Sequence, residues 1–312
     1  MKHQQIKALV QVADCGSIRA AARSMHISQS ALTRAMRELE EDVGAELLNR
    51  SYRGVSFTPA GKALLSRARL ILSTLERARE EVRQISGGAG ATVTLGITPV
   101  LGVTALPDVY KQFAQVMPEA ELVLKEGLLT EIIPDLIEGE LDFGIGITSQ
   151  EQLPTELSYT PLCALESRIF GRAGHPLAKA RDWSDLQDAR WILNLTGGSP
   201  GDLLLRWLYA QGLPRPSRIV RCYSPMLMLE MMRRTDLIGF GPGRLIDDPL
   251  AGVGVETFAV QPQPPAGSVG IVRMRGMPLT PAAQMMVTLI QRAITSGYGD
   301  ELANAPPELD EG

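Results

Sequence analysis

The sequence predicts a small helical unit, then one long helix, then a two-lobed α/β body, along a chain of 312 residues. Three patterns carry this prediction. Two short serine-capped helices joined by a tight connection occupy residues 17–39. Apolar residues then recur about every 3.5 positions over residues 61–85, and strand and helix patterns alternate from residue 91 onward. The fold class is therefore α followed by α/β.

The first unit opens with a helix over residues 2–16, in which apolar residues recur at helical spacing until Gly16 ends it. Ser17 and Ser28 are each placed to cap a following helix, because a serine oxygen accepts hydrogen bonds from the free N–H groups of a first turn. The second capped helix, from Ser28 to Leu39, has two different sides at about 100° per residue. The side expected to be buried carries Leu32, Ala35, Met36 and Leu39.

The other side of this helix is polar. It carries Ser30, Thr33, Arg34 and Arg37, with Gln29 at its leading edge. Hydroxyl and guanidinium groups hydrogen-bond base edges and phosphates in a major groove, so the pattern predicts a helix-turn-helix with residues 28–39 as recognition helix. A solvated amphipathic helix is the alternative. DNA binding is favoured by the matching helix before it, the basic hairpin after it and the charge distribution. The acidic run over residues 38–42 is expected to face solvent, away from DNA.

Residues 47–61 predict a hairpin with its tip at Tyr52-Arg53-Gly54. Arg50 and Arg53 project from it. Because the hairpin follows a helix-turn-helix, we interpret it as a wing with Arg53 at or in the minor groove. An ordinary basic hairpin is the alternative.

Charge is divided unevenly along the chain, although its net value is −4. Residues 1–90 hold 14 basic and 9 acidic side chains, a balance of +5, and the remaining 222 residues hold 17 basic and 26 acidic side chains, a balance of −9. A basic front on an acidic body indicates a nucleic-acid-binding head joined to a domain with another task.

A long helix follows the hairpin, with Thr58 as its cap and Pro59 in its first turn. Its apolar seam has the spacing of a coiled coil. The seam positions are Gly61, Leu64, Ala68, Ile71, Leu75, Ala78, Val82 and Ile85. We expect this helix to pair with its own copy, since charged residues leave only a narrow apolar strip. Packing against its own chain is the alternative.

Beyond a flexible joint, the order strand, helix, strand, helix, strand predicts a parallel sheet covered by helices. Strands are expected over 91–98, 120–126, 141–147, 190–195, 218–222, 236–240, 253–260 and 268–275. Paired strands are expected over 157–172. Helices are expected over 101–116, 130–139, 200–211, 225–234 and 281–296. The Asp-, Glu- and Pro-rich tail is expected to be disordered.

The predicted division of the chain has six parts. They are a winged helix-turn-helix over 1–58, a coiled-coil linker helix over 59–86, a flexible joint over 87–90, a first lobe over 91–161 and 265–296, a second lobe over 162–264, and a disordered acidic tail over 297–312.

Composition excludes several classes of protein. Three scattered cysteines form no CxxC pair and fit free thiols in a reducing cytoplasm, and three dispersed histidines predict no metal site. The chain has no glycine loop for a nucleotide, so we expect no cofactor. It has no run of 18 apolar residues and no secretion signal, so we expect a cytoplasmic protein with no membrane partner.

The head resembles that of the LysR-type transcriptional regulators. Four stretches carry the resemblance: IKALV at 6–10, GSIRAAA at 16–22, ISQSALTR at 27–34 and RSYRGVSFTPAG at 50–61. The resemblance implies a winged helix-turn-helix, a dimerising linker helix, commonly a homotetramer, and an effector domain similar to periplasmic solute-binding proteins. It implies binding to double-stranded promoter DNA, with RNA polymerase as a further candidate partner. The implied DNA contacts are Ser28, Gln29, Ser30, Thr33, Arg34, Arg37 and Arg53.

An effector site is expected where strands of the two lobes end. Thr98 and Pro99 end one strand, and Thr196, Gly197 and Ser199 follow another just before a helix, where free N–H groups suit an anion. The alternative is that these residues form only ordinary helix caps and turns. The family resemblance adds Val100, Leu128, Tyr223 and Pro242 as walls. Apolar Leu128 and Ile147 suggest a small organic acid with an apolar or aromatic part.

Two other functions compete with a ligand-responsive regulator. One is an enzyme with Ser199 as nucleophile, but no base accompanies it and Pro200 follows it directly, unlike a nucleophile elbow. We therefore expect no enzyme. The other is a DNA-binding oligomeric scaffold without a small-molecule effector.

Overall fold

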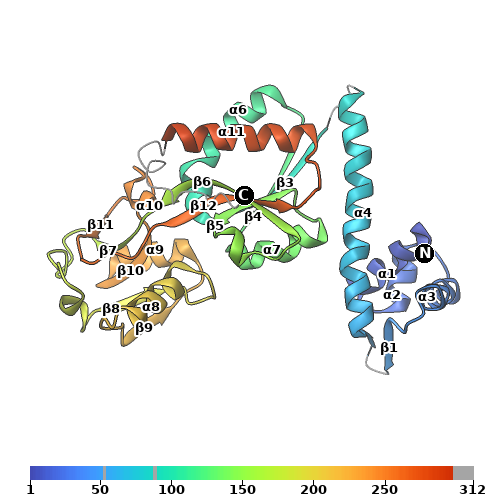
Figure 1. Cartoon of the computed structure of the whole chain (residues 1–312), viewed down its shortest axis with the longest axis horizontal. Coiled ribbons are helices and arrows are strands. Elements are labelled where there is room, and N and C mark those ends of the chain that lie inside the picture. Colours follow the sequence, from blue (N-terminus) through green and yellow to red (C-terminus); the bar gives the residue numbers. More distant parts are fainter. Residues whose placement is uncertain (52–53, 87–89, 298–312) are drawn as a thin grey trace, which may run out of the picture. The chain divides into compact units, whose positions relative to one another are not determined.

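The computed structural model describes residues 1–51, 54–86 and 90–297 (Figure 1). Their contacts form two compact units, the first containing the head, the long helix and Pro134–Leu141, and the second containing the rest of the body. Three predicted features lie outside the described residues: the turn residues Tyr52 and Arg53, positions 87–89 of the joint, and the tail after Gly297.

The head contains α1 (His3–Cys15), α2 (Ile18–Ser24) and α3 (Gln29–Val43). Both predicted serine caps are confirmed. The Ser17 hydroxyl accepts from the Ala20 N–H at 3.1 Å, and the Ser28 hydroxyl accepts from the Ala31 N–H at 3.1 Å. Gly16 ends α1 with a φ of 67°, a left-handed conformation that glycine adopts without strain.

Helix α3 is longer than predicted, since it continues through the acidic run and ends at Gly44. The run does not simply face solvent. Glu40 is half-buried, and its carboxylate accepts the N–H groups of Leu47 at 2.9 Å and Leu48 at 3.2 Å. It thereby satisfies the backbone where the chain enters the hairpin, and the prediction that this acidic side chain is solvated is wrong.

The head's core lies between these helices and the start of the long helix. Its buried side chains include Leu9, Val12, Leu32, Met36, Leu39 and Ala68. The hairpin pairs β1 (Leu48–Ser51) with β2 (Gly54–Phe57) in antiparallel register, with Ser51 opposite Gly54. The predicted hairpin strands are confirmed.

The long helix is α4 (Pro59–Ile85), and Thr58 caps it as predicted by accepting from the Gly61 N–H at 2.9 Å. Its apolar seam has two different environments. Gly61 and Ala68 are buried in the head, whereas from residue 71 onward the seam is exposed, reaching 65% at Val82 and 73% at Ile85. In the described chain the exposure of this second half rises along the helix from 38% at Ile71.

The first sheet of the body has the strand order β4-β3-β5-β12-β6. As predicted, β3 (Thr92–Ile97) runs parallel to β4 (Glu121–Glu126) and β5 (Phe143–Ile147), while β12 (Gly267–Met274) lies antiparallel between β5 and β6 (Leu157–Leu165). Figure 1 shows α6 (Leu106–Val116) and α11 (Pro281–Gly297) together on one face of this sheet. The opposite face carries α7 (Leu129–Glu138), whose Ile132 packs over Gly96. We call this sheet and its helices the first lobe.

The second sheet has the order β11-β7-β10-β8-β9. Its strands are β7 (Ser167–Arg172), β8 (Arg190–Leu193), β9 (Arg218–Arg221), β10 (Leu237–Pro242) and β11 (Val255–Phe258). The helices α8 (Pro200–Ala210), α9 (Pro225–Arg234) and α10 (Gly243–Asp247) accompany it. Two short 3-10 helices, η1 (Gln150–Gln152) and η2 (Trp183–Leu186), lie in the connections. We call the second sheet and its helices the second lobe.

Two predicted elements of the body differ from the structure. The helix expected over 101–116 is divided into α5 (Pro99–Thr104) and α6, where Pro107, which has no N–H to continue a helix, stands in the first turn of α6. The strands expected to pair over 157–172 belong to different sheets. Strand β6 pairs with β12 and β7 pairs with β10, so the chain crosses between sheets at Glu166.

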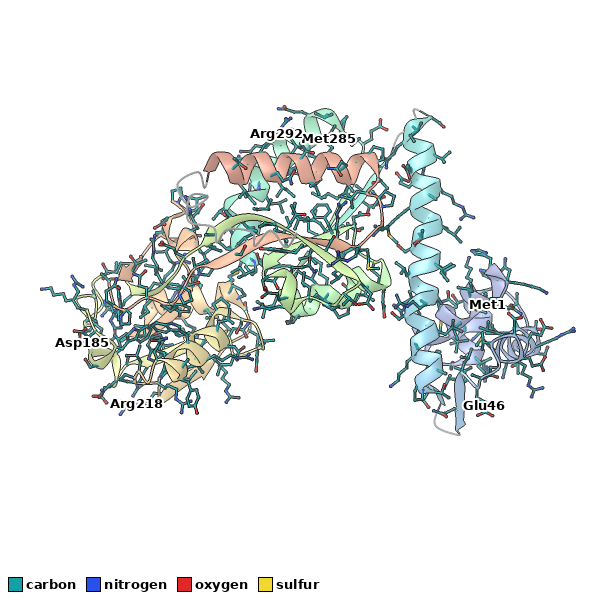
Figure 2. The ribbon with its side chains drawn as sticks, in the orientation of Figure 1. Met1, Glu46, Asp185, Arg218, Met285 and Arg292 are labelled. Carbon is teal, nitrogen blue, oxygen red and sulfur yellow. The ribbon has the colours of Figure 1, made fainter. Side chains whose placement is uncertain are left out.

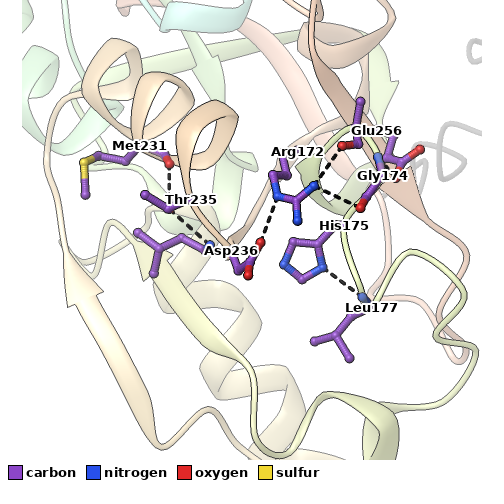
Figure 3. A network of polar contacts seen from close by, with 10 residues as sticks. Arg172, Gly174, His175, Leu177, Met231, Thr235, Asp236 and Glu256 are labelled. Carbon is purple, nitrogen blue, oxygen red and sulfur yellow. Dashed lines mark hydrogen bonds and ion pairs between the residues drawn. The ribbon is translucent and has the colours of Figure 1, made fainter.

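A polar network joins β7, β10 and β11 at one end of the second lobe (Figure 3). Arg172 donates from Nε to the Asp236 carboxylate at 2.8 Å and from Nη1 to the carbonyl of Gly174 at 2.9 Å. The Gly174 N–H in turn donates to Glu256 at 2.9 Å. Beside them, His175 is buried and accepts the Leu177 N–H at Nδ1, so it serves as a structural hydrogen-bond acceptor.

Candidate DNA-binding surface and effector site

Helix α3 presents the two sides that its sequence predicts. Leu32, Met36 and Leu39 are each no more than 1% exposed. On the opposite side an open hollow is lined by Gln29, Ser30, Thr33, Arg34 and Arg37. All five belong to the predicted DNA-binding set, so the structure brings these side chains together on one surface; Arg53, the remaining wing residue, lies outside the described residues.

The hydroxyls of this surface are partly engaged with the helix itself. Thr33 donates to the carbonyl of Gln29 at 2.8 Å, and the Ser28 and Ser30 hydroxyls lie 3.0 Å apart. Thr33 can therefore offer a partner only the lone pairs of its hydroxyl oxygen and its methyl group. Gln29, at the N-terminal edge, is exposed and lies where a helix end presents side chains to base edges.

The two arginines of the surface differ in their contacts. Arg34 donates from Nε to the Glu38 carboxylate at 2.9 Å and remains 83% exposed. Arg37 is exposed, and no carboxylate pairs with it in the part of the chain that the structure describes. We expected Glu38 to face solvent with the rest of the acidic run, and its ion pair with Arg34 was not predicted. The four-residue spacing from Arg34 was the available signal.

The predicted effector residues of the first lobe lie at the carboxyl end of β3. Thr98 is 7% exposed, and its hydroxyl is buried without a hydrogen-bond partner in the described structure. Val100 is buried beside it, and Pro99 and Leu128 are half-buried. A buried hydroxyl without a partner costs free energy, so Thr98 offers a binding group that a ligand or water can satisfy.

Ser199 has a different role from the one predicted. Its side chain is fully buried, and its hydroxyl donates to the carbonyl of Asn194 at 2.6 Å and accepts from the Asp202 N–H at 3.3 Å. The Asp202 carboxylate accepts the Gly198 N–H at 2.9 Å. Ser199 is therefore the cap of α8, and the carboxylate of Asp202 already occupies the place near the helix start where we expected an anion. The Ser-x-x-Asp spacing was the signal for this capping arrangement.

The remaining predicted residues of the second lobe are accessible. Thr196 is half-buried, Gly197 is exposed and Tyr223 is 67% exposed, while Pro242 is half-buried at the end of β10. The loop that holds Thr196 approaches the first lobe, since a Cβ built on Gly198 would lie 3.7 Å from the Thr130 methyl group at the start of α7. The structure thus brings the 196–199 loop against the lobe that holds Thr98.

The described residues contain neither a metal-binding cluster nor a helix suited to span a membrane. No cluster of three or more His, Cys, Asp or Glu side chains there could hold a metal ion. Within the same ranges, each helix falls short of the length or the apolar character that crossing a bilayer requires.

Two families match this chain. Residues 3–62 match the bacterial regulatory helix-turn-helix proteins of the lysR family, and residues 86–295 match the LysR substrate binding domain. The chain belongs to the LysR family of transcriptional regulators. The resemblance noted from the sequence is confirmed, as is the fold class.

Similar LysR-type regulators extend over nearly the whole chain. The regulator TdcA of Escherichia coli K12 is 26% identical over 92% of this chain and 92% of its own. The regulator PcaQ of Agrobacterium fabrum is 26% identical over 94% of this chain and 95% of its own. Both relatives are named as HTH-type transcriptional regulators.

Solved structures of LysR-type proteins share the fold. A cysteine-to-aspartate variant of full-length OxyR from Pseudomonas aeruginosa has a TM-score of 0.67 at 20% identity and covers 95% of each chain. Full-length CbnR complexed with its target DNA has a TM-score of 0.64 at 21% identity and covers 94% of this chain and 100% of its own.

Proposed function

We propose that this LysR-type regulator binds a promoter operator through α3. We further propose that its binding to that operator changes when a small organic acid binds between the two lobes. The observation that carries the proposal is the polar, exposed side of α3 above a fully buried apolar side. Because the protein acts on DNA, we place it in the cytoplasm, with RNA polymerase as a further candidate partner.

The proposed DNA contacts are the five residues that line the hollow on α3, together with Ser28 and the wing residue Arg53. Gln and Arg side chains can each form two hydrogen bonds with one base edge, whereas Ser and Thr are less selective. The positive balance of the first 90 residues supports phosphate binding around these base contacts. The division of the chain into head, linker helix and two effector lobes is part of the same proposal.

A homodimer through α4 is supported by the exposed second half of its seam. A heptad seam left open to water is stabilised when a second copy covers it. The dimer also places two recognition helices on successive major grooves.

A homotetramer is supported by the open edges of the two sheets. Edge strand β4 exposes Val123 and Leu124 and carries two acidic residues and one basic residue, Glu121, Glu126 and Lys125, whereas edge strand β9 exposes Val220 between Arg218 and Arg221. Figure 2 shows Arg218 on the outside of the second lobe. Such edges pair readily with another chain, and their opposite charges favour contact between the first lobe of one copy and the second lobe of another.

The proposed effector site keeps Thr98 and Thr196 as polar contacts and Val100, Leu128, Tyr223, Pro99, Pro242 and Gly197 as walls. Ser199 is omitted because its hydroxyl is occupied. The buried, unpartnered hydroxyl of Thr98 supports a ligand with one polar end, and the apolar walls support an aromatic remainder. An effector that favours one arrangement of the lobes shifts the population toward it, which alters the spacing of the DNA-binding heads.

DNA binding is tested with the full-length protein and fluorescent duplexes taken from the promoter regions beside its own gene. We expect binding to one of them that falls steeply with salt, and a loss of about tenfold or more for Gln29→Ala and for Arg37→Ala. Gln187→Ala, on the exposed surface of the second lobe, is the control. Equal binding of all duplexes by wild type and variants would contradict the proposal.

Effector binding is tested by thermal shift with benzoate and salicylate, and with benzamide as a neutral comparison. We expect the acids to raise the melting temperature of the wild type but not of Thr98→Val or Thr196→Val, with Thr288→Val on α11 as a matched control. Absence of any shift across a wider panel of small acids would favour the alternative, a DNA-binding scaffold without an effector.

A further inference from the structure

The exposed side of α3 also contains a carboxylate, next to the hollow lined by Arg34. Glu38 lies four residues after Arg34, and its Oε1 accepts from Arg34 Nε at 2.9 Å. The two side chains are 83% and 42% exposed. Both are thus accessible on the surface that the proposed function assigns to the major groove.

The geometry of this pair leaves one end of the guanidinium available. A guanidinium has five N–H donors in a planar fork, and the carboxylate takes the one on Nε. The two terminal nitrogens remain to donate in parallel. A pair of parallel donors fits the O6 and N7 acceptors of guanine in the major groove, whereas adenine presents one acceptor and one donor at those positions.

The charge of Glu38 has a second effect. A carboxylate near DNA is repelled by phosphates, and its cost rises as water is excluded from the groove. Its pairing with Arg34 offsets that cost and also removes one positive charge from those free to bind phosphate anywhere on a duplex. Such a pair lowers the affinity of the protein for arbitrary DNA sequences more than its affinity for the operator, which increases specificity.

We propose that Glu38 is a positioning residue that holds Arg34 with its terminal nitrogens toward the base edges, so that Arg34 selects guanine at one position of each half-site. This inference rests on the proposed function of α3. An ion pair that only stabilised the helix would leave the base preference of the protein unchanged.

Three substitutions separate the two roles of Glu38. Glu38→Gln retains an oxygen that can accept from Nε but removes the charge. Glu38→Ala removes both. Glu41→Ala is the control. It removes the same charge from an exposed position of α3 about one turn farther along, and Glu41 does not pair with Arg34.

The experiment selects bound duplexes from a randomised DNA library with the full-length protein and reads the base preference at each position. For the wild type we expect one position per half-site with at least tenfold preference for guanine, which Arg34→Ala abolishes. Glu38→Ala should lower that preference at least threefold and raise affinity for a sequence-free competitor duplex by two- to fivefold. Glu38→Gln should keep the guanine preference while raising competitor affinity, and Glu41→Ala should leave the preference unchanged.

The outcomes separate failure of this inference from failure of the proposed function. If the guanine preference depends on Arg34 but not on Glu38, or if no position depends on Arg34 while the library is still selected, the positioning role is overturned and DNA recognition by α3 stands. If the wild type selects no sequence at all, the proposed function itself fails. The melting temperatures of all variants, measured in parallel, should remain within about 2 °C of the wild type, since the pair is exposed.

Discussion

The Tyr159 hydroxyl lies 2.7 Å from the Ser268 hydroxyl, joining β6 to β12 across the first lobe. Burial raises the pKa of Tyr159 to about 12, although the hydrogen bond with Ser268 acts in the opposite direction. Folding therefore favours the protonated phenol. Its contribution to stability is complete below the ordinary tyrosine pKa of about 10 and is lost as the pH rises toward 12.

From this we predict that the free energy of unfolding of the full chain falls between about pH 10 and pH 12. Urea denaturation at pH 9, 10, 11 and 12 measures it. The double variant Tyr159→Phe with Ser268→Ala removes the titrating group without leaving an unpaired hydroxyl, so its stability should decline less over the same range. Parallel declines in both proteins would show that Tyr159 is not responsible.

The contact between Gly61 and Leu47 gives a second prediction. A Cβ on Gly61 would lie 2.0 Å from the Leu47 carbonyl oxygen, which also accepts the Thr58 N–H at 3.0 Å and cannot move freely. We expect Gly61→Ala to destabilise the head by about 3 kcal/mol, as overpacking does at its upper range. Thermal unfolding measures this. Gly102→Ala in α5, where a Cβ meets only a methyl group at 3.9 Å, is the control and should be neutral or stabilising.

Thr98 gives a third prediction, in which stability and binding change in opposite directions. Its hydroxyl is buried without a partner, so Thr98→Val should raise the melting temperature of the unliganded protein by about 2 °C, because it removes a desolvated polar group at nearly constant volume. The same variant should lose the thermal shift produced by aromatic acids. Thr98→Ser, which retains the hydroxyl, should keep that response. A destabilised Thr98→Val would indicate that the hydroxyl has a partner after all.

Much of this fold follows from local sequence patterns, because most elements are short and begin or end at capping residues or glycines. Ser17, Ser28 and Thr58 cap the helices that the sequence assigns to them, and Gly16 ends α1. The parallel arrangement of β3, β4 and β5 follows from the alternation of strand and helix. Sheet membership was harder to predict. The strands on either side of Glu166 are adjacent in sequence, yet each finds its partners far along the chain, and no local pattern records those partners.

The candidate sites show the same limit at the level of side chains. A helical projection predicts which residues of α3 face outward, because exposure follows the period of the helix. The four-residue spacing allows Glu38 to pair with Arg34, but the projection alone does not decide between that pair and a solvated carboxylate. For Ser199, residue type and position suggested a ligand contact, but hydrogen bonds to Asn194 and Asp202 occupy its hydroxyl. Such competition between local partners depends on rotamers, which the sequence does not specify.

The role of Ser199 as a cap gives a fourth prediction. Ser199→Ala should destabilise the second lobe by about 1 kcal/mol, because the Asp202 N–H and the Asn194 carbonyl both lose a partner. Ser199→Ala should change the affinity of the protein for an acid only slightly, once the lower stability of the variant is taken into account. Calorimetric titration with salicylate at a temperature well below unfolding separates the two effects. Selective loss of ligand affinity in a fully folded variant would restore Ser199 to the effector site.

The exposed half of the α4 seam gives the fifth prediction, which concerns assembly. Val82 is 65% exposed in the described chain, so Val82→Glu should not destabilise a monomer. In a dimer paired along the seam, the same change places two carboxylates opposite each other in an apolar contact and should lower the dimer affinity at least tenfold. Sedimentation velocity over a range of concentrations measures this. Arg79→Ala, also on α4 but outside the seam and 66% exposed, makes the same one-unit change of net charge and is the matched control. Equal association of both variants would place the contact between copies elsewhere than on this helix, whereas selective dissociation of Val82→Glu, accompanied by loss of DNA affinity, would show that the two heads act together.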